Sequence, residues 1–375
     1  MTEVQFIQFN ESHLKIQTTD WGIDSELSEF FSFFVDGYKF MPKFKSGQWS
    51  GKINLFDVRS KKLPKGLLKV AVKFCKSRNY TFNIEPELNP RTDITEAEVN
   101  TFIKSIPVTS KGKEINIRDY QVEAIQQSMK YYRSMLISPT ASGKSLILYN
   151  KIRYHIDVLD HNVVLIVPTV ALTRQMETDF IDYSTKNGWD VESHTQLLYS
   201  GKEKLFNKKL LISTWQSLMA MSKNNKEAYR HIIERTDLLC IDEVHSFSST
   251  ATLDIANSFV NTKWRTGTTG TLDDSKVNKL QLIGIMSEPF QVITTKQLMD
   301  ANSIVKLKIN VLKLQYPDEY KKQLSGMNYK DEIKHLVTLD ARNQFISELA
   351  TRCKGVTLVL FTFIELHGNT LYKKI

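Results

Sequence analysis

The chain has 375 residues, carries a formal net charge of +9 at pH 7, and is 41% hydrophobic and 24% charged. Its length is enough for two or three domains, and no apolar run approaches the length of a membrane span, so we expect a globular protein with no membrane partner. The three cysteines lie far apart, which excludes a disulfide framework and a cysteine-rich metal site.

Residues 1–90 are predicted to form a small, separate α/β domain. The first ten residues contain neither the basic nor the apolar segment of a secretory signal, which favours a cytoplasmic protein. Residues 25–34 are expected to be helical, with Leu27, Phe30, Phe31 and Phe34 on one face. Residues 52–56 are expected in a hairpin, and residues 67–76 in a second helix.

A basic patch lies within this domain. Between Lys39 and Arg78 there are twelve lysines and arginines and a single acidic residue, Asp57. Phenylalanine and tryptophan residues are interleaved with them. Positive charge attracts phosphate backbones and aromatic rings stack on bases, so we predict DNA binding here; the alternative is a solvated face over an aromatic core. The candidate DNA-binding residues are Lys43, Lys45, Lys52, Lys61, Lys62 and Lys65.

Residues 91–114 are predicted to be a linker with a bridging helix. The polar stretch 85–92 contains two prolines and introduces the linker. Thr95 and Glu98 have the spacing of a capping box, which predicts a short helix after Thr95. Residues 107–114 are expected to be a second loose stretch.

From about residue 115 to 300 the sequence alternates short apolar strands with helices. That alternation predicts a parallel sheet covered by helices on both faces, with the chemistry at the carboxyl ends of the strands. The expected strands are residues 135–138, 163–167, 197–199, 210–213, 238–241 and 264–267.

A phosphate-binding loop follows the first of these strands. Residues 138–145 are small or polar and end in Gly143-Lys144-Ser145, directly before an apolar helix. Backbone N–H groups and the helix N-terminus can face a phosphate, Lys144 can neutralise it, and the Ser145 hydroxyl can hold Mg²⁺. Alone, this triplet is also compatible with a chance surface turn.

A pair of carboxylates ends the strand 238–241. Asp242 can hold Mg²⁺, and Glu243 beside it can orient a water molecule for attack on a phosphate. Because such a pair about a hundred residues after a phosphate loop is rare by chance, it favours a nucleotide site over a surface turn.

With these residues in place, the chain resembles the DExH-type helicases of superfamily 2, and its fold class is expected to be α/β, RecA-like (P-loop NTPase). Six stretches match family motifs in order: residues 118–121, 139–145, 167–175, 212–218, 242–245 and 268–272. The resemblance implies ATP and Mg²⁺ as cofactors, DNA as partner, and Glu243, Asp242 and Lys144 as catalytic residues, with Mg²⁺ held by Ser145 and Asp242.

The same resemblance assigns the remaining candidate residues. In the family, the glutamine of the first motif reads adenine and the last motif couples the nucleotide site to the nucleic acid. ATP-binding candidates are Arg118, Gln121, Thr140, Ala141, Ser142, Gly143, Lys144 and Ser145. Coupling candidates are His245, Thr269, Gly270 and Thr271. Along the nucleic-acid backbone the candidates are Pro168, Thr169, Arg174, Thr214 and Trp215.

A narrower resemblance covers almost the whole chain. Residues 36–52, with Trp49 and Gly51, and residues 289–299 look like the corresponding parts of the UvsW-type helicases of T-even-type phages. That family remodels branched DNA and R-loops in replication, recombination and repair. The resemblance therefore implies branched or forked DNA, or an RNA–DNA hybrid, as substrate, and a bacterial host cytoplasm as location.

Three positions depart from the helicase pattern. Ser138 stands where the generic phosphate loop has its first glycine, Ala141 replaces a glycine, and Gly270 replaces a common alanine. Because alanine adopts a positive φ only at a cost, we expect the loop to keep Ala141 at negative φ.

Residues 301–375 are expected to begin a second RecA-like domain without completing it. We expect strands at 305–314 and 356–363 and helices at 331–339 and 342–352. An arginine finger of the kind that accelerates phosphoryl transfer about 10³–10⁵-fold is expected to come from elsewhere, so this chain should hydrolyse ATP weakly alone. A separate chain supplying the missing part is an expected partner.

Two other functions remain open at this point. A nucleotide- and nucleic-acid-binding module without turnover would share the same motifs. A P-loop kinase is disfavoured because it needs an acceptor site and would not carry the ordered set from Arg118 to Leu272.

Overall fold

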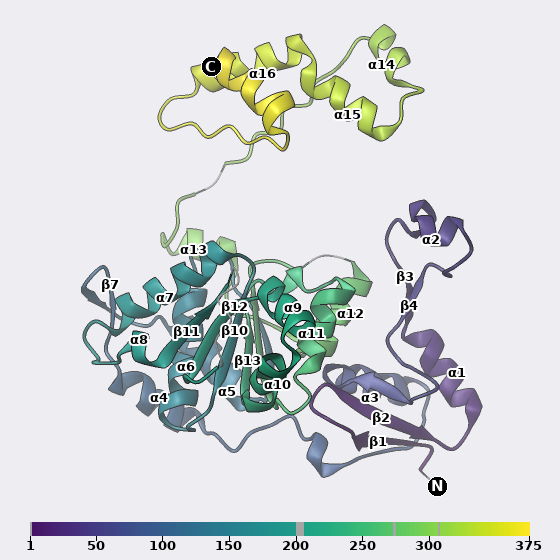
Figure 1. The fold of residues 1–375 in the computed structure, drawn as a ribbon, viewed down its shortest axis with the longest axis vertical. Helices are drawn as coiled ribbons and strands as arrows, with labels where there is room; N and C mark the ends of the chain where they lie inside the picture. The colour runs from purple at the N-terminus through teal and green to yellow at the C-terminus, as the bar shows by residue number, and fades with distance from the viewer. Residues whose placement is uncertain (1, 200–205, 273–274, 307) are drawn as a thin grey trace. The chain divides into compact units, whose positions relative to one another are not determined.

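The computed structural model describes residues 2–199, 206–272, 275–306 and 308–375 (Figure 1). The chain forms two compact units, Met1–Lys306 and Leu307–Ile375, which are described separately. Among the described residues, no helix is both long enough and apolar enough to cross a bilayer.

The first unit begins with a four-stranded sheet in the order β5-β2-β1-β6. β1 pairs antiparallel with β2, and their alternating apolar residues Val4, Phe6, Leu14 and Ile16 are fully buried. These two strands were not anticipated from the sequence. The elements of this part are β1 (Val4–Gln8), β2 (His13–Thr18), α1 (Trp21–Phe30), β5 (Lys62–Pro64), η2 (Lys65–Leu67), α3 (Leu68–Ser77), β6 (Phe82–Ile84) and η3 (Pro86–Leu88).

A two-stranded arm extends away from this sheet (Figure 1). It consists of β3 (Ser32–Phe34), η1 (Tyr38–Phe40), α2 (Pro42–Lys45) and β4 (Lys52–Asn54). The predicted helix over 25–34 is therefore wrong at its end: α1 stops at Phe30, and Phe33 pairs with Ile53 across the arm. The hairpin expected at 52–56 is confirmed at β4, and the helix expected at 67–76 is confirmed as α3.

The larger part of the first unit is a seven-stranded parallel sheet, which confirms the predicted fold class. Its strand order is β11-β12-β10-β13-β14-β9-β15. The strands are β9 (Arg133–Ile137), β10 (Val163–Val167), β11 (Thr195–Leu198), β12 (Leu210–Thr214), β13 (Leu238–Ile241), β14 (Trp264–Thr269) and β15 (Pro289–Gln291). The edge strand β15 was not anticipated, because three residues carry too little pattern.

Helices cover both faces of this sheet (Figure 1). Alternate residues of the central strands face opposite sides: Leu165 packs with residues of α6 and α7, whereas Ile166 packs with residues of α9 to α12. The helices are α4 (Glu96–Ser105), α5 (Asp119–Lys130), α6 (Lys144–Asp157), α7 (Val170–Ser184), α8 (Val191–His194), α9 (Trp215–Asn224), α10 (Lys226–Arg235), η4 (Val244–Ser246), α11 (Thr250–Ser258), α12 (Lys276–Ile285) and α13 (Thr295–Asp300).

The segment between the two sheets differs in part from the expected linker. The capping box of Thr95 and Glu98 is present at the start of α4. Residues 107–114, expected to be loose, contain the hairpin of β7 (Val108–Ser110) and β8 (Lys113–Ile115).

The small domain and the parallel sheet meet through closely packed backbones. A Cβ atom on Gly66 would lie 2.0 Å from the carbonyl oxygen of Ile283, and one on Gly284 would lie 2.9 Å from Cβ of Pro64. Only glycine fits at these two positions, so the junction between η2 and α12 leaves no room for a side chain.

The second unit contains helices and extended segments. The helices are α14 (Asp318–Leu324), α15 (Tyr329–Thr338), α16 (Asp340–Arg352), η5 (Ile364–Gly368) and α17 (Asn369–Lys374), so the two predicted helices are confirmed. Of the strands expected at 305–314 and 356–363, none is formed by the described residues, and residue 307 lies outside them. A strand needs a neighbour for its backbone hydrogen bonds, and the described residues from 308 onward contain no strand; Val356 and Leu358 are fully or largely exposed.

Candidate functional site

The phosphate loop connects the carboxyl end of β9 to the start of α6. Gly143 caps this helix with φ 86°, in the left-handed region that favours glycine. A Cβ atom on Gly143 would lie 2.3 Å from Nε2 of Gln121. Both the backbone conformation and the contact therefore require glycine directly before Lys144.

The Arg118–Gln121 segment lies directly against this loop. The hydroxyl of Tyr120 and Nε2 of Gln121 donate to the Ser142 carbonyl at 3.0 and 2.9 Å, and Oε1 of Gln121 accepts from the Arg118 backbone N–H at 2.9 Å. The buried Gln121 amide retains a second N–H and a second lone pair. It can hold the loop and still face a base.

Ala141 has φ 66°, so the expectation of a negative φ is wrong. The loop turns back on itself between the buried Ser138 and Ser142, whose hydroxyls lie 2.5 Å apart, and Ser142 also donates to the Pro139 carbonyl at 2.6 Å. These hydrogen bonds hold the turn although a left-handed alanine costs about 1–2 kcal/mol. Ala141 and Thr140 are exposed at the tip of the loop.

Lys144 forms an ion pair with Glu243. Its Nζ lies 2.5 Å from Oε1 of Glu243, whose strand β13 lies two strands away from β9 in the sheet. Burial alone would raise the pKa of Glu243, but the hydrogen bond and charge of Lys144 outweigh it and lower that pKa. Glu243 is therefore ionised at neutral pH, in a backbone conformation with φ 48°.

Asp242 and Ser145 are the candidates for holding a metal ion. Asp242 is buried, accepts a hydrogen bond from Thr268 Oγ1 at 2.7 Å, and has a pKa raised by burial. The Ser145 hydroxyl lies 2.8 Å from the Tyr183 hydroxyl. A carboxylate and a hydroxyl are oxygen ligands of the kind that Mg²⁺ takes beside nucleotide phosphates.

His245 connects the carboxylates to the end of β14. Its Nδ1 lies 2.7 Å from Thr269 Oγ1 and 3.3 Å from Oε2 of Glu243. Thr269 also donates to the Thr271 carbonyl at 2.7 Å, and the Gly270 N–H approaches Oε2 of Glu243 at 3.5 Å. Three of the four residues predicted to couple the sites, His245, Thr269 and Gly270, thus lie around the Glu243 carboxylate, and Thr271 contacts Thr269.

The residues predicted to follow the nucleic-acid backbone lie at two helix N-termini. Thr169 caps α7 by accepting from Leu172 N–H, and Thr214 caps α9 by accepting from Ser217 N–H. Both helices begin where β10 and β12 end, so their positive ends face the same edge of the sheet as the phosphate loop.

Of the neighbouring candidates, Arg174 is exposed on α7, and its Nε donates to the Tyr199 hydroxyl at 3.3 Å. Pro168 is half-buried before α7. Trp215 is also half-buried and packs against the core beneath α9, which leaves it a smaller role in contacting nucleic acid.

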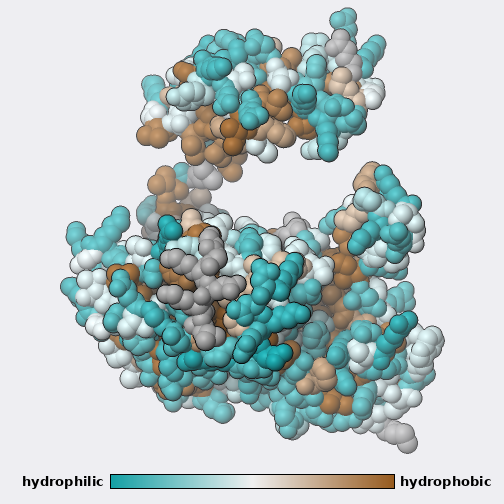
Figure 2. Space-filling view, viewed as in Figure 1, coloured by the Kyte–Doolittle hydropathy of each residue, from teal (hydrophilic) through white to brown (hydrophobic). Residues whose placement is uncertain are grey.

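The predicted basic patch divides into two parts in the structure. Lys43, Lys45 and Lys52 are exposed on the arm, beside the exposed Phe40 and Phe34 (Figure 2). The Phe34 and Tyr38 rings stack 4.6 Å apart, and Lys52 lies over Phe34 at 4.9 Å. The arm therefore presents cations and aromatic rings together.

The other three lysines of the patch lie on the small sheet. Lys61 pairs with the buried Asp24, and Lys62 lies over the Phe9 ring at 4.3 Å. Lys65 is buried at the domain junction and pairs with Glu11 at 2.7 Å, so the expectation that it contacts DNA on an exposed face is wrong. The sequence shows that Lys65 is charged, but it does not show that the side chain points into the domain junction.

Three residues of the site were not anticipated. Tyr120 holds the phosphate loop, Thr268 holds Asp242, and Tyr183 holds Ser145. Tyr120 and Thr268 lie within sequence motifs that were already identified, so both residues could have been predicted from the motifs that contain them. Tyr183 follows Ser145 by 38 residues, and no local pattern connects the two.

Comparison with known proteins gives two family matches. Residues 2–85 match the family model described as the N-terminal part of the DNA helicase UvsW. Residues 114–274 match the model of the res subunit of type III restriction enzymes.

Individual relatives agree with these matches. The chain is 32% identical to the ATP-dependent DNA helicase uvsW of Enterobacteria phage T4 over 99% of this chain and 72% of that protein. It is 25% identical to the DNA 3′-5′ translocase XPB2 of Sulfurisphaera tokodaii, over 63% of this chain and 48% of that protein. A crystal structure of T4 UvsW matches with a TM-score of 0.69 and 30% identity, covering 93% of this chain and 67% of that one.

Proposed function

The chain belongs to the family of the phage UvsW DNA helicases, and from this membership we propose that it uses ATP hydrolysis to move along and remodel branched DNA, such as forks, junctions or R-loops. The observation that carries the proposal is the continuous set of contacts from Lys144 through Glu243 to His245 and Thr269. These contacts join the phosphate loop to the ends of β13 and β14, and β13 pairs with β10, whose end leads into α7 of the proposed DNA surface.

The proposed ATP site uses groups from three strand ends. Lys144 would bind the outer phosphates, and Gln121 would face the adenine. Ser145 and Asp242 would hold a Mg²⁺ ion brought by the nucleotide, which would supply positive charge beside the phosphates. Thr268 would orient Asp242, and Tyr183 would orient the Ser145 hydroxyl.

We propose that nucleotide binding separates Lys144 from Glu243. Phosphate oxygens would replace the carboxylate as the partner of the Lys144 ammonium. Glu243 would then be free to accept a proton from an attacking water molecule, as a general base does. His245 contacts both Glu243 and Thr269, and Thr269 is the last residue of β14. A movement of Glu243 would therefore shift the end of β14 through His245.

The proposed DNA surface has two parts. The N-termini of α7 and α9, with Thr169, Thr214 and Arg174, would bind phosphates of one strand through N–H groups and charge. The lysines and aromatic rings of the arm would contact the branch point, where unpaired bases are available for stacking.

We further propose that this chain hydrolyses ATP weakly alone and faster with a chain that supplies a second RecA-like domain. The support is that the described residues from 308 to 375 form helices without a sheet. A nucleotide-binding module without turnover is the second candidate, favoured by the ion pair that occupies Lys144.

Steady-state phosphate release with and without forked DNA tests these proposals, with Lys144→Ala and Glu243→Gln as variants. We expect slow release that forked DNA stimulates and that both variants abolish. Release equal to that of both variants under all conditions would favour the binding module. A rate typical of complete helicases would contradict the need for a second chain.

A further inference from the structure

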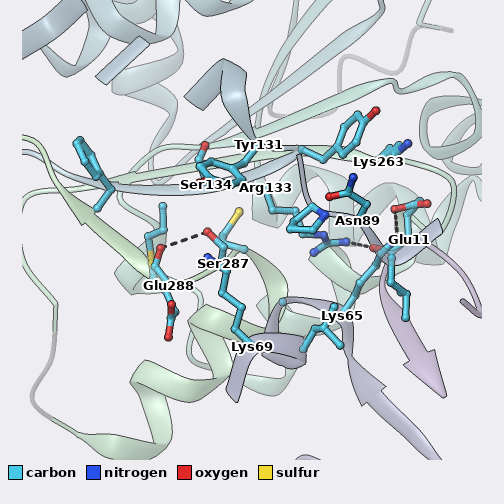
Figure 3. A pocket seen from close by; sticks show the side chains of 18 of the residues that line it. Glu11, Lys65, Lys69, Asn89, Tyr131, Arg133, Ser134, Lys263, Ser287 and Glu288 are labelled. Atoms are coloured by element: carbon cyan, nitrogen blue, oxygen red, sulfur yellow. Dashed lines mark hydrogen bonds and ion pairs between the residues drawn. The ribbon is translucent and has the colours of Figure 1, made fainter. Parts of the chain in front are cut away.

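A partly open pocket of about 120 Å³ lies between the small domain and the parallel sheet, at the edge opposite the ATP site (Figure 3). Arg133 begins β9 at this edge, and the phosphate loop follows the other end of the same strand. At about 3.3 Å per residue, β9 separates the two by roughly 13 Å. The pocket is therefore distinct from the ATP site.

The pocket is lined by more cations than carboxylates. Lys65, Lys69, Arg133 and Lys263 line it, against Glu11 and Glu288 (Figure 3). Glu11 pairs with Lys65 at 2.7 Å, and Glu288 pairs with Lys73 at 2.5 Å. Among the described residues, Lys69, Arg133 and Lys263 form no ion pair with a carboxylate.

Arg133 is buried and has spare donors. Its guanidinium donates to the carbonyl oxygens of Ile285, at 2.8 Å, and of Glu11. A guanidinium has five N–H donors, so three remain for another acceptor. A buried charge without an ionic partner is costly, and burial lowers the pKa of Arg133 to about 10.

A second buried arginine increases the positive charge behind this wall. Arg265 is 1% exposed and donates to Ser12 Oγ at 2.8 Å and to carbonyl oxygens of Phe259, Ala256 and Thr262. None of these acceptors carries a charge. Glu11 is thus the only carboxylate described that lies close to Lys65, Arg133 and Arg265 together.

The rim positions further cations over aromatic rings. Lys69 lies 5.4 Å from the Tyr131 ring centre, and Lys263 lies 3.7 Å from that of Tyr132. Both lysines are exposed, so a ligand in the pocket can reach them from solvent.

We propose that this pocket binds a small phosphate-bearing molecule whose phosphate group contacts Arg133, Lys69 and Lys263. The ligand would bridge the two domains, because Lys69 belongs to α3 of the small domain and Arg133 to β9 of the parallel sheet. Free small molecules are favoured over the DNA backbone because the pocket lies at the start of β9, at the edge of the sheet opposite the helix N-termini of α7 and α9.

Isothermal titration with inorganic phosphate at constant ionic strength tests the proposal, using Lys144→Ala protein to silence the phosphate loop. We expect saturable binding at one site. Lys69→Gln with Lys263→Gln should weaken it about tenfold or more, since each removes a charge-assisted contact. Glu11→Gln should tighten binding, because it removes the carboxylate that competes for these cations.

Lys104→Gln, a change at an exposed lysine of α4, is the matched control and should leave the affinity unchanged. Absence of saturable binding, or equal affinity in all variants, would overturn the proposal. Loss of phosphate binding when forked DNA is bound first would instead assign the site to the DNA backbone. The readout does not depend on ATP hydrolysis, so its failure is distinguishable from failure of the proposed function.

Discussion

Nζ of Lys144 lies 2.5 Å from Oε1 of Glu243, so the cation proposed to bind ATP phosphates is held by the carboxylate proposed to activate water. In the absence of nucleotide, the ammonium and the carboxylate are each other's ionic partner. In the proposed mechanism a nucleotide breaks this ion pair as it binds and so releases the carboxylate proposed to activate water. Nucleotide binding and activation of Glu243 would then be a single event.

Glu243→Gln should separate ATP affinity from ATP turnover. Removing the general base should lower phosphate release by about 10²–10⁴-fold. Freeing Lys144 from a partly exposed ion pair worth about 0.2–1 kcal/mol should tighten ATP binding by up to roughly fivefold. Titration with a fluorescent ATP analogue measures the affinity. Lys144→Ala is the control and should lose both; weaker binding in Glu243→Gln would contradict the competition.

Ala141→Gly should stabilise the phosphate loop. A left-handed alanine costs about 1–2 kcal/mol, and glycine costs about 0.4–1 kcal/mol through the unfolded chain, so a net gain of up to about 1.6 kcal/mol is expected. Urea denaturation measures it, and ATP affinity should rise or stay equal. The matched change Ala220→Gly in the interior of α9 should destabilise instead, by about 0.5–1 kcal/mol. Destabilisation by both would mean that φ of Ala141 is not positive in solution.

Thr269→Val should uncouple DNA from ATP hydrolysis. The change keeps the side-chain shape but removes the hydroxyl that contacts His245 and the Thr271 carbonyl. We expect stimulation by forked DNA to fall about tenfold while hydrolysis without DNA changes less, as for the loss of one or two buried hydrogen bonds. Thr266→Val on the same strand is the control and should keep the stimulation ratio. Equal ratios in the two variants would exclude the coupling role.

Neutralising the arm should flatten the salt dependence of DNA binding. Each lysine that contacts a phosphate contributes about 0.9 to the slope of log affinity against log salt, so the triple change to glutamine should lower it by roughly two to three. The three residues are Lys43, Lys45 and Lys52. Fluorescence anisotropy with forked DNA at several salt concentrations measures the slope. A matched triple at exposed lysines of the other domain, Lys104, Lys113 and Lys226, should leave it unchanged; equal slopes would return the arm to an ordinary solvated surface.

The sequence predicted the sheet and the meeting of distant residues because parallel strands bring their carboxyl ends to one edge. Gln121, Lys144 and Glu243 are up to 122 residues apart, yet the order of strands and helices places Gln121 against the phosphate loop and Lys144 against Glu243. Hydrophobic strands such as 163–167 and 238–241 were predicted to the residue, because strands buried on both faces have continuous apolar sequences.

The features that the sequence did not predict depend on where a side chain points and on which other segment it contacts. The charge of Lys65 is visible in the sequence, but its side chain turns inward to Glu11. Alanine prefers a negative φ, but the hydrogen bonds of the loop hold Ala141 at a positive φ. Residues 356–363 are apolar enough for a strand. A strand forms only where a neighbouring strand accepts its hydrogen bonds, and the sequence of the segment does not show whether such a neighbour exists.

Lys151 should make the stability of the fold depend on pH between about 7 and 10. Its ammonium is fully buried beneath the parallel sheet, where it donates to the Ser128 carbonyl and lies 5.2 Å from the Trp264 ring centre. Burial lowers the pKa of Lys151 to about 7, whereas an unfolded lysine titrates near 10.4. Between these values the unfolded chain binds one more proton, so the free energy of unfolding should rise with pH by up to about 1.4 kcal/mol per unit.

Urea denaturation at pH 7.5 and 8.5 measures this slope, from which the buried thiols of Cys75 and Cys240 subtract a part, because their pKa values are raised to about 11 and about 12 in the folded chain and fall to about 8.5 on unfolding. Lys151→Met keeps the length of the side chain without its charge, so it should remove this contribution and flatten the difference between the two pH values. Lys104→Met, at an exposed lysine of α4, should keep the wild-type slope. Because the buried ammonium has no carboxylate partner among the described residues, Lys151→Met should also be at least as stable as the wild type at pH 7.5. An unchanged slope in Lys151→Met would mean that this lysine is protonated in the folded chain and finds a charge partner or water.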